Sequence, residues 1–344
     1  MMDRRRFLYS LVAACGGCAT SGSSSGAGGW SSAELRRADA IAKGNGAKGW
    51  AAWHGHRELV SWQTHERGPS LSLTKVLGAL AATKAAGEGW LSDSERVSAT
   101  IPEWRGDARK SRITVLMLLQ QTAGLEAGVA SLYRNPADKG RNALLLSVVD
   151  EPGSLFRYGP ACWEVLGELL QRKLSSRGET LEKFLHRAVM RPVGLSSPNW
   201  RSDKKGRFFL STGAEMSVEE LGRLGRTLGK LLSGESTDGF DPEIFARMTR
   251  TSAANPIFGG GIWRNANARK AGAYPVEIED VLDPPRGGGF WAGACMSLRQ
   301  PASMVALVGS SGKRVFIWPG ENRVVARLGR SSAWKDGPFL GTLS

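Results

Sequence analysis

The sequence feature that most constrains the fold is the placement of strand-like and helix-like segments along the chain. Short apolar runs bounded by turn residues occur near the start and again beyond about residue 255, and helical periodicity fills the middle, over about residues 76–254. The strand-like runs are 49–53, 58–62, 259–263, 303–308, 314–318 and 323–328. We therefore predict an α/β (α+β) fold in which strands from both ends form one antiparallel sheet, flanked by helices, with a mostly helical insert.

The helices are predicted from apolar residues at helical spacing and from start and stop signals. Ser217 and Glu220 form a capping box at the start of one helix, and Thr114 is the predicted N-cap of another. The predicted helices cover 31–42, 72–87, 115–121, 163–170, 180–190 and 217–233. Residues 126–142 are expected to form a polar loop, and Gly287–Trp291 a glycine-rich loop.

Composition places the chain among globular proteins, because 41% of its 344 residues are hydrophobic and 23% are charged. The formal net charge is +14, with basic residues spread along the chain, as expected of an exported protein attracted to anionic surfaces. The sequence contains no nucleic-acid motif and no zinc-ligand spacing, so we expect no nucleic acid, metal or cofactor. A disulfide between Cys162 and Cys295 is possible, but the sequence does not decide whether it forms.

Residues 1–14 have the features of an export signal. Arg4 and Arg5 resemble a twin-arginine motif, and the apolar run that follows is too short to span a membrane. Val12–Cys15 resembles a bacterial lipobox, which predicts lipidation of Cys15 and attachment to the membrane. The alternatives are lipidation at Cys18 and cleavage that releases a soluble periplasmic protein. The remaining predicted segments are a Ser/Gly-rich tether (15–30) and a domain (31–344) with a sheet part (31–75 and 255–344) and a helical part (76–254).

Ser72 and Lys75 open the apolar helix at 72–87 and stand three residues apart, so that their side chains share one helical face. A serine hydroxyl becomes a nucleophile when a base removes its proton, and a lysine kept from water can have its pKa lowered enough to be that base. The same Ser-x-x-Lys spacing recurs at Ser202, Ser310 and Ser332, outside any long apolar helix. We interpret Ser72 as the candidate nucleophile, with a helix N-cap as the alternative.

Tyr158 is the candidate third group, because the loop 152–160 delivers it immediately before an apolar helix. A tyrosine phenol can pass protons if a cation lowers its pKa, and Lys75 is the expected cation or proton acceptor. The alternative is an ordinary half-buried aromatic side chain. A Ser-His-Asp set is not favoured, since the only G-x-S-x-G match, at 22–26, lies in the tether and the four histidines lack supporting contexts.

Taken together, these segments resemble the β-lactamase-related serine hydrolases, a family of class C β-lactamases, D-alanyl-D-alanine carboxypeptidases, esterases and amide hydrolases. Ser72-Leu73-Thr74-Lys75 resembles the first motif of this family, and Tyr158 after Pro152-Gly153 resembles the second. Gly309-Ser310-Ser311-Gly312 resembles the third, and Ile113–Leu125 is similar to the helix after the first motif. The resemblance covers roughly residues 48–340 and implies the β-lactamase/transpeptidase-like fold.

The mechanism implied by this resemblance is acyl transfer. Ser72 would attack a carbonyl carbon, and Lys75 and Tyr158 would pass its proton to the leaving group. The backbone N–H groups of Ser72 and Lys313 would form the oxyanion hole, and water would then release the acyl group. The implied substrate-binding residues are Ser310, Ser311 and Gly312.

Two positions depart from the family pattern. Pro160 stands where the second motif usually has Asn, and Ser310 stands where the third motif usually begins with Lys or His. Lys313 or Arg314 is expected to replace that cation in part. A literal Tyr-x-Asn at 133–135 lacks the preceding Pro-Gly and the following helix, and we interpret it as a loop coincidence.

The leading hypothesis is therefore an exported serine hydrolase that acts on a small-molecule ester, an amide or a peptide. The two departures favour an esterase or amidase over an efficient β-lactamase. The alternatives are a catalytically silent protein that holds cell-wall peptides on the same fold, and a basic envelope protein that binds anionic polymers.

Overall fold

The computed structural model describes residues 29–134, 136–196 and 199–343. The predicted export signal, the lipidation of Cys15 and nearly all of the tether therefore lie outside the described residues.

A seven-stranded antiparallel sheet joins the two ends of the chain, in the strand order β2-β1-β11-β10-β9-β6-β5. Strand β1 from the N-terminal end pairs with β11 from the C-terminal end, with Trp53 opposite Val324. The predicted fold class is thereby confirmed. The strands of this sheet are β1 (Ala47–His54), β2 (Arg57–Trp62), β5 (Phe258–Gly259), β6 (Ile262–Arg264), β9 (Val305–Gly309), β10 (Lys313–Trp318) and β11 (Arg323–Gly329).

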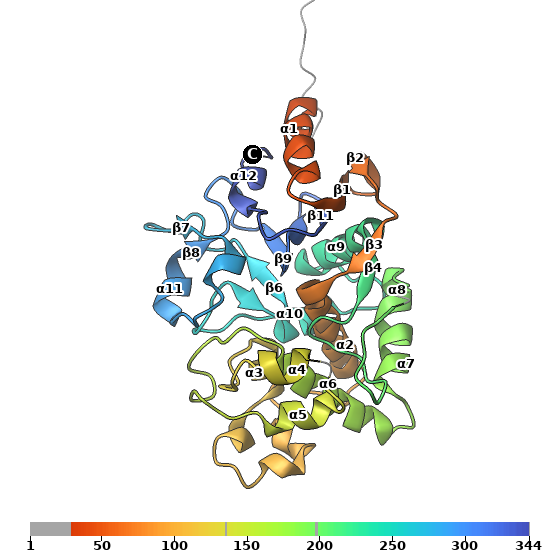
Figure 1. Cartoon of the computed structure of the whole chain (residues 1–344), viewed down its shortest axis with the longest axis vertical. Helices are drawn as coiled ribbons and strands as arrows, with labels where there is room; N and C mark the ends of the chain where they lie inside the picture. Colours follow the sequence, from red (N-terminus) through yellow and green to blue (C-terminus); the bar gives the residue numbers. More distant parts are fainter. Residues whose placement is uncertain (1–28, 135, 197–198, 344) are drawn as a thin grey trace, which may run out of the picture.

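Most of the helices lie between β2 and β5 in the chain, and Figure 1 shows helices α3 to α6 gathered below the sheet. Helix α9 is an exception, because it packs directly on β10 and β11. The helices are α1 (Ser32–Lys43), α2 (Lys75–Gly87), α3 (Val115–Leu119), α4 (Val129–Tyr133), α5 (Lys139–Leu145), α6 (Ala161–Ser175), α7 (Leu181–Leu185), α8 (Arg191–Val193), α9 (Val218–Leu232), α10 (Pro242–Met248), α11 (Gly288–Gly293) and α12 (Asp336–Leu340). Two small sheets pair β3 (Arg67–Pro69) with β4 (Glu215–Ser217) and β7 (Tyr274–Pro275) with β8 (Ala294–Cys295).

Two predicted helix starts, those of α9 and α3, are confirmed by their caps. The Ser217 hydroxyl accepts from the Glu220 backbone N–H, and the Glu220 carboxylate accepts from the Ser217 N–H in return. The Thr114 hydroxyl likewise accepts from the Met117 N–H at the start of α3. Each cap satisfies a backbone donor that would otherwise lack a partner at the first turn.

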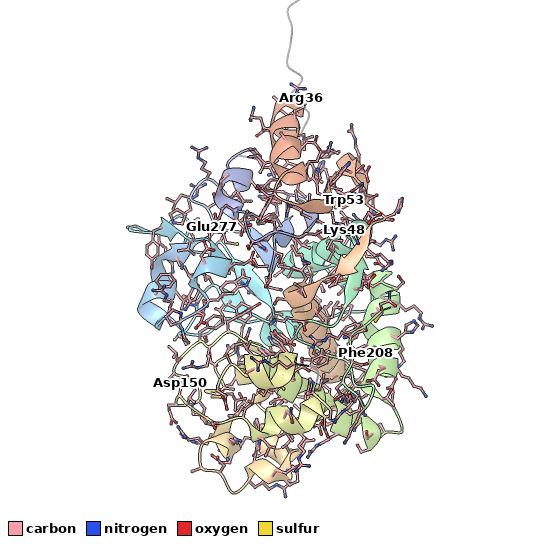
Figure 2. All side chains as sticks on the ribbon, in the orientation of Figure 1. Arg36, Lys48, Trp53, Asp150, Phe208 and Glu277 are labelled. Carbon is pink, nitrogen blue, oxygen red and sulfur yellow. The ribbon has the colours of Figure 1, made fainter. Side chains whose placement is uncertain are left out.

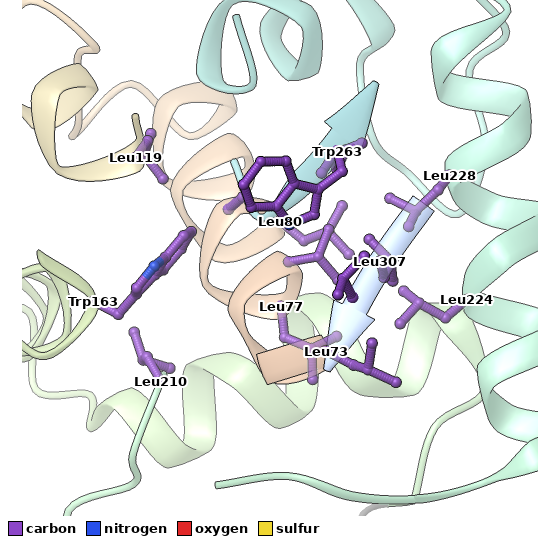
Figure 3. Packing of buried hydrophobic residues seen from close by; sticks show 14 of the residues in the cluster. Leu73, Leu77, Leu80, Leu119, Trp163, Leu210, Leu224, Leu228, Trp263 and Leu307 are labelled. Carbon is purple, nitrogen blue, oxygen red and sulfur yellow. The ribbon is translucent and has the colours of Figure 1, made fainter. Parts of the chain in front are cut away.

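Helix α2 lies between the sheet and the helical segment, and nearly all of its residues are buried. Figure 3 shows Trp163 and Leu210 on one side of α2 and Leu307, Leu224 and Leu228 on the other. Gly78 permits this approach, because a Cβ atom there would lie 3.1 Å from the Trp163 ring. Side chains fill the space between the sheet and the helices throughout the molecule (Figure 2).

Three local predictions are wrong. Residues 126–142, expected as a loop, contain α4 and the start of α5, whose N-cap Asp138 accepts from the Arg141 N–H. The glycine-rich segment Gly287–Trp291 contains most of helix α11, fixed by a hydrogen bond from Trp291 Nε1 to the Arg286 carbonyl. Residues Leu71–Thr74 form a 3-10 turn, η1, so the α-helix begins at Lys75 rather than Ser72. The helices α4, α5 and α11 thus form in segments whose polar or glycine-rich composition is typical of loops, and a local hydrogen bond fixes α5 and α11.

Candidate active site

Ser72 and Lys75 meet at the junction of η1 and α2. Lys75 Nζ lies 2.9 Å from Ser72 Oγ, a hydrogen-bonding distance, as the three-residue spacing predicted. The N-cap residues of η1 and α2 are Ser70 and Thr74. Ser72 therefore does not serve as a helix N-cap, and its hydroxyl instead contacts an amine.

The Lys75 amine is almost wholly removed from solvent, with 1% of the residue exposed. Its second hydrogen bond goes to the Ser211 carbonyl, at 3.0 Å. Burial lowers the pKa of Lys75 to about 7, because a charged ammonium loses its hydration, while the nearby Glu164 opposes that shift. Near neutral pH a large fraction of Lys75 is therefore the free amine, which can accept a proton from Ser72.

Tyr158 completes the group of three, since its hydroxyl hydrogen-bonds Ser72 and its ring centroid lies 4.9 Å from Lys75 Nζ. The loop that carries Tyr158 is fixed by Gln121 at the end of α3. The Gln121 carbonyl accepts from the Arg157 N–H, and the Gln121 side-chain oxygen accepts from the Gly159 N–H at 2.8 Å. The structure thus brings together all three residues predicted as catalytic.

The expectation that Lys75 lowers the pKa of Tyr158 is wrong, whereas the alternative, that Lys75 accepts the Tyr158 proton, stays a prediction. Burial raises the pKa of Tyr158 to about 12, and the hydrogen bond with Ser72 offsets this only in part. A lysine whose own pKa is near 7 is only partly charged at neutral pH, and this charge does not offset the cost of burying a phenolate. Tyr158 is therefore a phenol that can donate its proton.

The predicted substrate-binding residues Ser310, Ser311 and Gly312 form the turn between β9 and β10. This turn approaches η1 closely, because a Cβ atom on Gly309 would lie 3.1 Å from the Ser70 carbonyl oxygen. Ser310 is exposed, whereas Ser311 has a φ of 64° and donates its N–H to Glu279 Oε1. The segment that resembles the third motif therefore lies beside the turn that carries Ser72.

Lys313 begins β10, opposite Gly309 in the sheet. The predicted role of its backbone N–H in an oxyanion hole remains a prediction. The Lys313 side chain turns to the Gly329 carbonyl, at 2.8 Å.

The expectation that Lys313 or Arg314 replaces the missing cation is wrong. Arg314 is 1% exposed, and its guanidinium donates to Asp336 Oδ1 at 2.7 Å and to Glu279 Oε2 at 2.6 Å. Lys313 is committed to backbone carbonyls. Neither side chain is free to bind a substrate carboxylate, and the carboxylate of Glu279 lies close enough to Tyr158 to act on its pKa.

The structure also identifies neighbours of the site that sequence reasoning missed. Tyr133, interpreted as a loop coincidence, ends α4 with a phenol close to Tyr158 and Glu164, and burial raises its pKa. Asn135 lies outside the described residues. A buried ion pair lies behind Lys75, with Lys139 Nζ 2.8 Å from Glu164 Oε2. The sequence signal that could have pointed to this ion pair is Glu164, a charged residue inside the apolar stripe of α6.

The two thiols whose pairing was left open are free and buried. Cys162 lies in α6, where burial raises its pKa to about 12, and Cys295 lies in β8. Within the described ranges, no group of three His, Cys, Asp or Glu residues could hold a metal ion. Over the same part of the chain, no helix has the length and apolar character that crossing a membrane requires.

Comparison with known proteins gives one family and several similar structures. The family model described as Beta-lactamase matches residues 38–329. A putative beta-lactamase from Bacteroides dorei is similar at a TM-score of 0.67 and 16% identity, covering 91% of this chain and 98% of the other. A D-stereospecific amidohydrolase from Streptomyces sp. is similar at a TM-score of 0.61 and 14% identity, with coverage of 90% and 98%. EstCE1, a hydrolase with promiscuous acyltransferase activity, is similar at a TM-score of 0.60 and 16% identity, with coverage of 90% and 97%. No curated protein matches the chain.

Proposed function

The chain belongs to the beta-lactamase family, and from that premise we propose that it is a serine hydrolase that cleaves esters or amides through an acyl-enzyme on Ser72. The observation that carries the proposal is the 2.9 Å contact between Ser72 Oγ and a buried lysine amine whose pKa is lowered to about 7. A solvent-exposed lysine would remain protonated at neutral pH and could not act as the base.

In the proposed reaction, Ser72 Oγ bonds to the substrate carbonyl carbon while its proton moves to Lys75 Nζ. The bond from that carbon to the leaving oxygen or nitrogen then breaks. The leaving group takes a proton from Tyr158, which regains one from Lys75. A water molecule attacks the acyl carbon, Lys75 accepts its proton, and Ser72 Oγ is released in protonated form. Backbone N–H groups of Ser72 and Lys313 are the proposed donors to the oxyanion.

The proposed substrates are esters and amides without a free carboxylate beside the acyl group. Ser310 supplies no positive charge, and Lys313 and Arg314 are committed to other partners. Glu279 would face a substrate carboxylate as a like charge, which costs binding energy. The lack of a free cation and the presence of a carboxylate at this segment favour an esterase or amidase over an efficient β-lactamase or D,D-peptidase. EstCE1, a hydrolase with promiscuous acyltransferase activity, and the D-stereospecific amidohydrolase from Streptomyces sp. carry out hydrolysis or acyl transfer of the same chemical kind.

A fluorophosphonate probe, which reacts with activated serines, tests the proposal. We expect stoichiometric labelling of the wild type at Ser72 and none in Ser72→Ala. Ser202→Ala is the matched control, because Ser202 stands in the same Ser-x-x-Lys spacing in a different setting, and it should label fully. A p-nitrophenyl ester panel with nitrocefin then ranks substrates. Absence of wild-type labelling and turnover would overturn the proposal in favour of a silent peptide-binding protein.

We further propose that the protein is exported and anchored through Cys15, on the basis of the leader sequence alone. Expression in a bacterial host with radiolabelled palmitate should label the wild type and not Cys15→Ser, while Cys18→Ser should keep the label. Labelling that survives Cys15→Ser would contradict the assignment.

A further inference from the structure

Directly behind the Ser72–Lys75 contact lies a buried ion pair that the proposed reaction does not use. Lys139 Nζ on α5 and Glu164 Oε2 on α6 are 2.8 Å apart, and these residues are 2% and 0% exposed. Removing two charges from water is costly, and such a pair is often no more stabilising than apolar residues of the same size. Stability alone therefore does not account for the pair.

Glu164 is connected to Lys75 through one residue. Its Oε1 accepts the backbone N–H of Ser211 at 3.0 Å, and the carbonyl of the same Ser211 accepts from Lys75 Nζ at 3.0 Å. The backbone of Ser211 is thus held at its N–H by the ion pair and at its carbonyl by the lysine. A shift of Glu164 would move the carbonyl that positions the amine.

Glu164 also lies one helical turn from the position of a group that this chain lacks. Pro160, which replaces the Asn of the second motif, is the N-cap residue of α6 and has no side-chain donor or acceptor. The backbone N–H of Glu164 donates to the Pro160 carbonyl at 3.0 Å, one helical turn further on. Residues four apart on a helix share a face, so Glu164 lies on the same face of α6 as position 160.

We propose that Glu164 is a positioning residue for Lys75: through the backbone of Ser211 it holds the amine against Ser72, and its charge, shared with Lys139, sets the electrostatic environment in which Lys75 exchanges its proton. The inference rests on the proposed function.

The charges around this group come from several elements. Lys75 itself is flanked by Tyr158 and, across α6, by Glu164. Other titratable groups lie further from the amine. Tyr133 lies near Tyr158 and Glu164, and Glu279 and Arg314 lie near Tyr158. Around Lys139 lie Arg207, Asp203 and Glu168. Of these, Glu164 is the group whose charge opposes the lowered pKa of Lys75.

The sign of the effect follows from this arrangement. A nearby negative charge favours the protonated amine, so removing it lowers the pKa of Lys75 and lets the free base form at lower pH. Glu164→Gln keeps an oxygen for the Ser211 N–H while removing the charge. Lys139→Met leaves Glu164 with Lys75 as its nearest cation, which favours the protonated amine and moves the base form to higher pH.

The test is the rate of Ser72 labelling by the fluorophosphonate across about pH 5 to 9, in which activity rises as Lys75 loses its proton. We expect the midpoint to fall by roughly 1 pH unit or more in Glu164→Gln and to rise in Lys139→Met. Glu168→Gln is the matched control, because Glu168 lies one turn further along α6 in ion pairs with Arg172 and Arg207, with no contact to Ser211. Its midpoint should match the wild type.

The double variant Glu164→Gln/Lys139→Met covers the case in which a single variant leaves a lone buried charge and does not fold. It should fold, and its midpoint should fall, because the charge acting on Lys75 is gone. Midpoints of all folded variants equal to the wild type, with only thermal stability changed, would overturn the inference and leave the pair a packing element. Wild-type labelling of Ser72 in that same experiment would show that the proposed function itself stands.

Discussion

The two sides of Ser72 differ sharply in how much of the family's chemistry they keep. On the side of α2 and α6, Ser72, Lys75 and Tyr158 meet within hydrogen-bonding or ring-contact distance. On the side of the β9–β10 turn, the cation usual in the third motif is absent, and the nearby Arg314 is saturated by carboxylates. The comparison suggests a division within the site: the groups proposed for acyl transfer are in contact, whereas the described part of the β9–β10 turn has Ser310 in place of the expected cation.

The largest expected effect is on the proton-transfer side. Lys75→Met should lower kcat/KM for a p-nitrophenyl ester by about 10³-fold, because general-base help of this kind contributes 10²- to 10⁴-fold. Lys84→Met, nine residues further along the same helix α2 and half-buried, is the control and should keep nearly full activity. Steady-state kinetics measure this loss. Equal turnover by Lys75→Met and the wild type would show that Lys75 is not the general base.

A smaller loss is expected at Tyr158. Its raised pKa makes it a proton donor, so Tyr158→Phe should lower kcat/KM by about 10²-fold for an alkyl ester or amide, whose leaving group needs a proton. For a p-nitrophenyl ester, whose leaving group departs as an anion, the loss should be several-fold smaller. If both substrates lost equally, Tyr158 would act by positioning rather than by protonating the leaving group.

The smallest predicted effect lies on the other side of Ser72. Ser310→Lys restores a cation in an exposed turn and should raise the turnover of carboxylate-bearing substrates such as nitrocefin by about tenfold. A neutral ester should change little. The gain should shrink as salt is added, because the new charge is solvent-exposed. Unchanged nitrocefin turnover in Ser310→Lys would show that carboxylate recognition needs more than the missing cation.

Sequence reasoning reached the individual strands, the capped helices and the Ser72–Lys75 contact because each depends on local pattern, and it reached Tyr158 through the family resemblance. The capping box at Ser217 and the spacing of Ser72 and Lys75 are examples. It failed where long-range packing decides. The Glu164–Lys139 pair joins residues 25 positions apart on different helices. The ion pairs of Arg314 with Asp336 and Glu279 form only where α12 and the 3-10 turn η6 (Ile278–Val281) lie beside β10. Burial also reversed the expected shift at Tyr158, since desolvation is a property of the folded chain.

The central claim is that Lys75 is a free amine near neutral pH, and its titration can be observed directly. Heteronuclear NMR of the lysine side chains, with the Lys75 resonance assigned by its absence in Lys75→Met, should give a midpoint near pH 7, as against the ordinary value of 10.5. A midpoint at that ordinary value would mean that Lys75 stays protonated beside Ser72, and the proposed base would not exist.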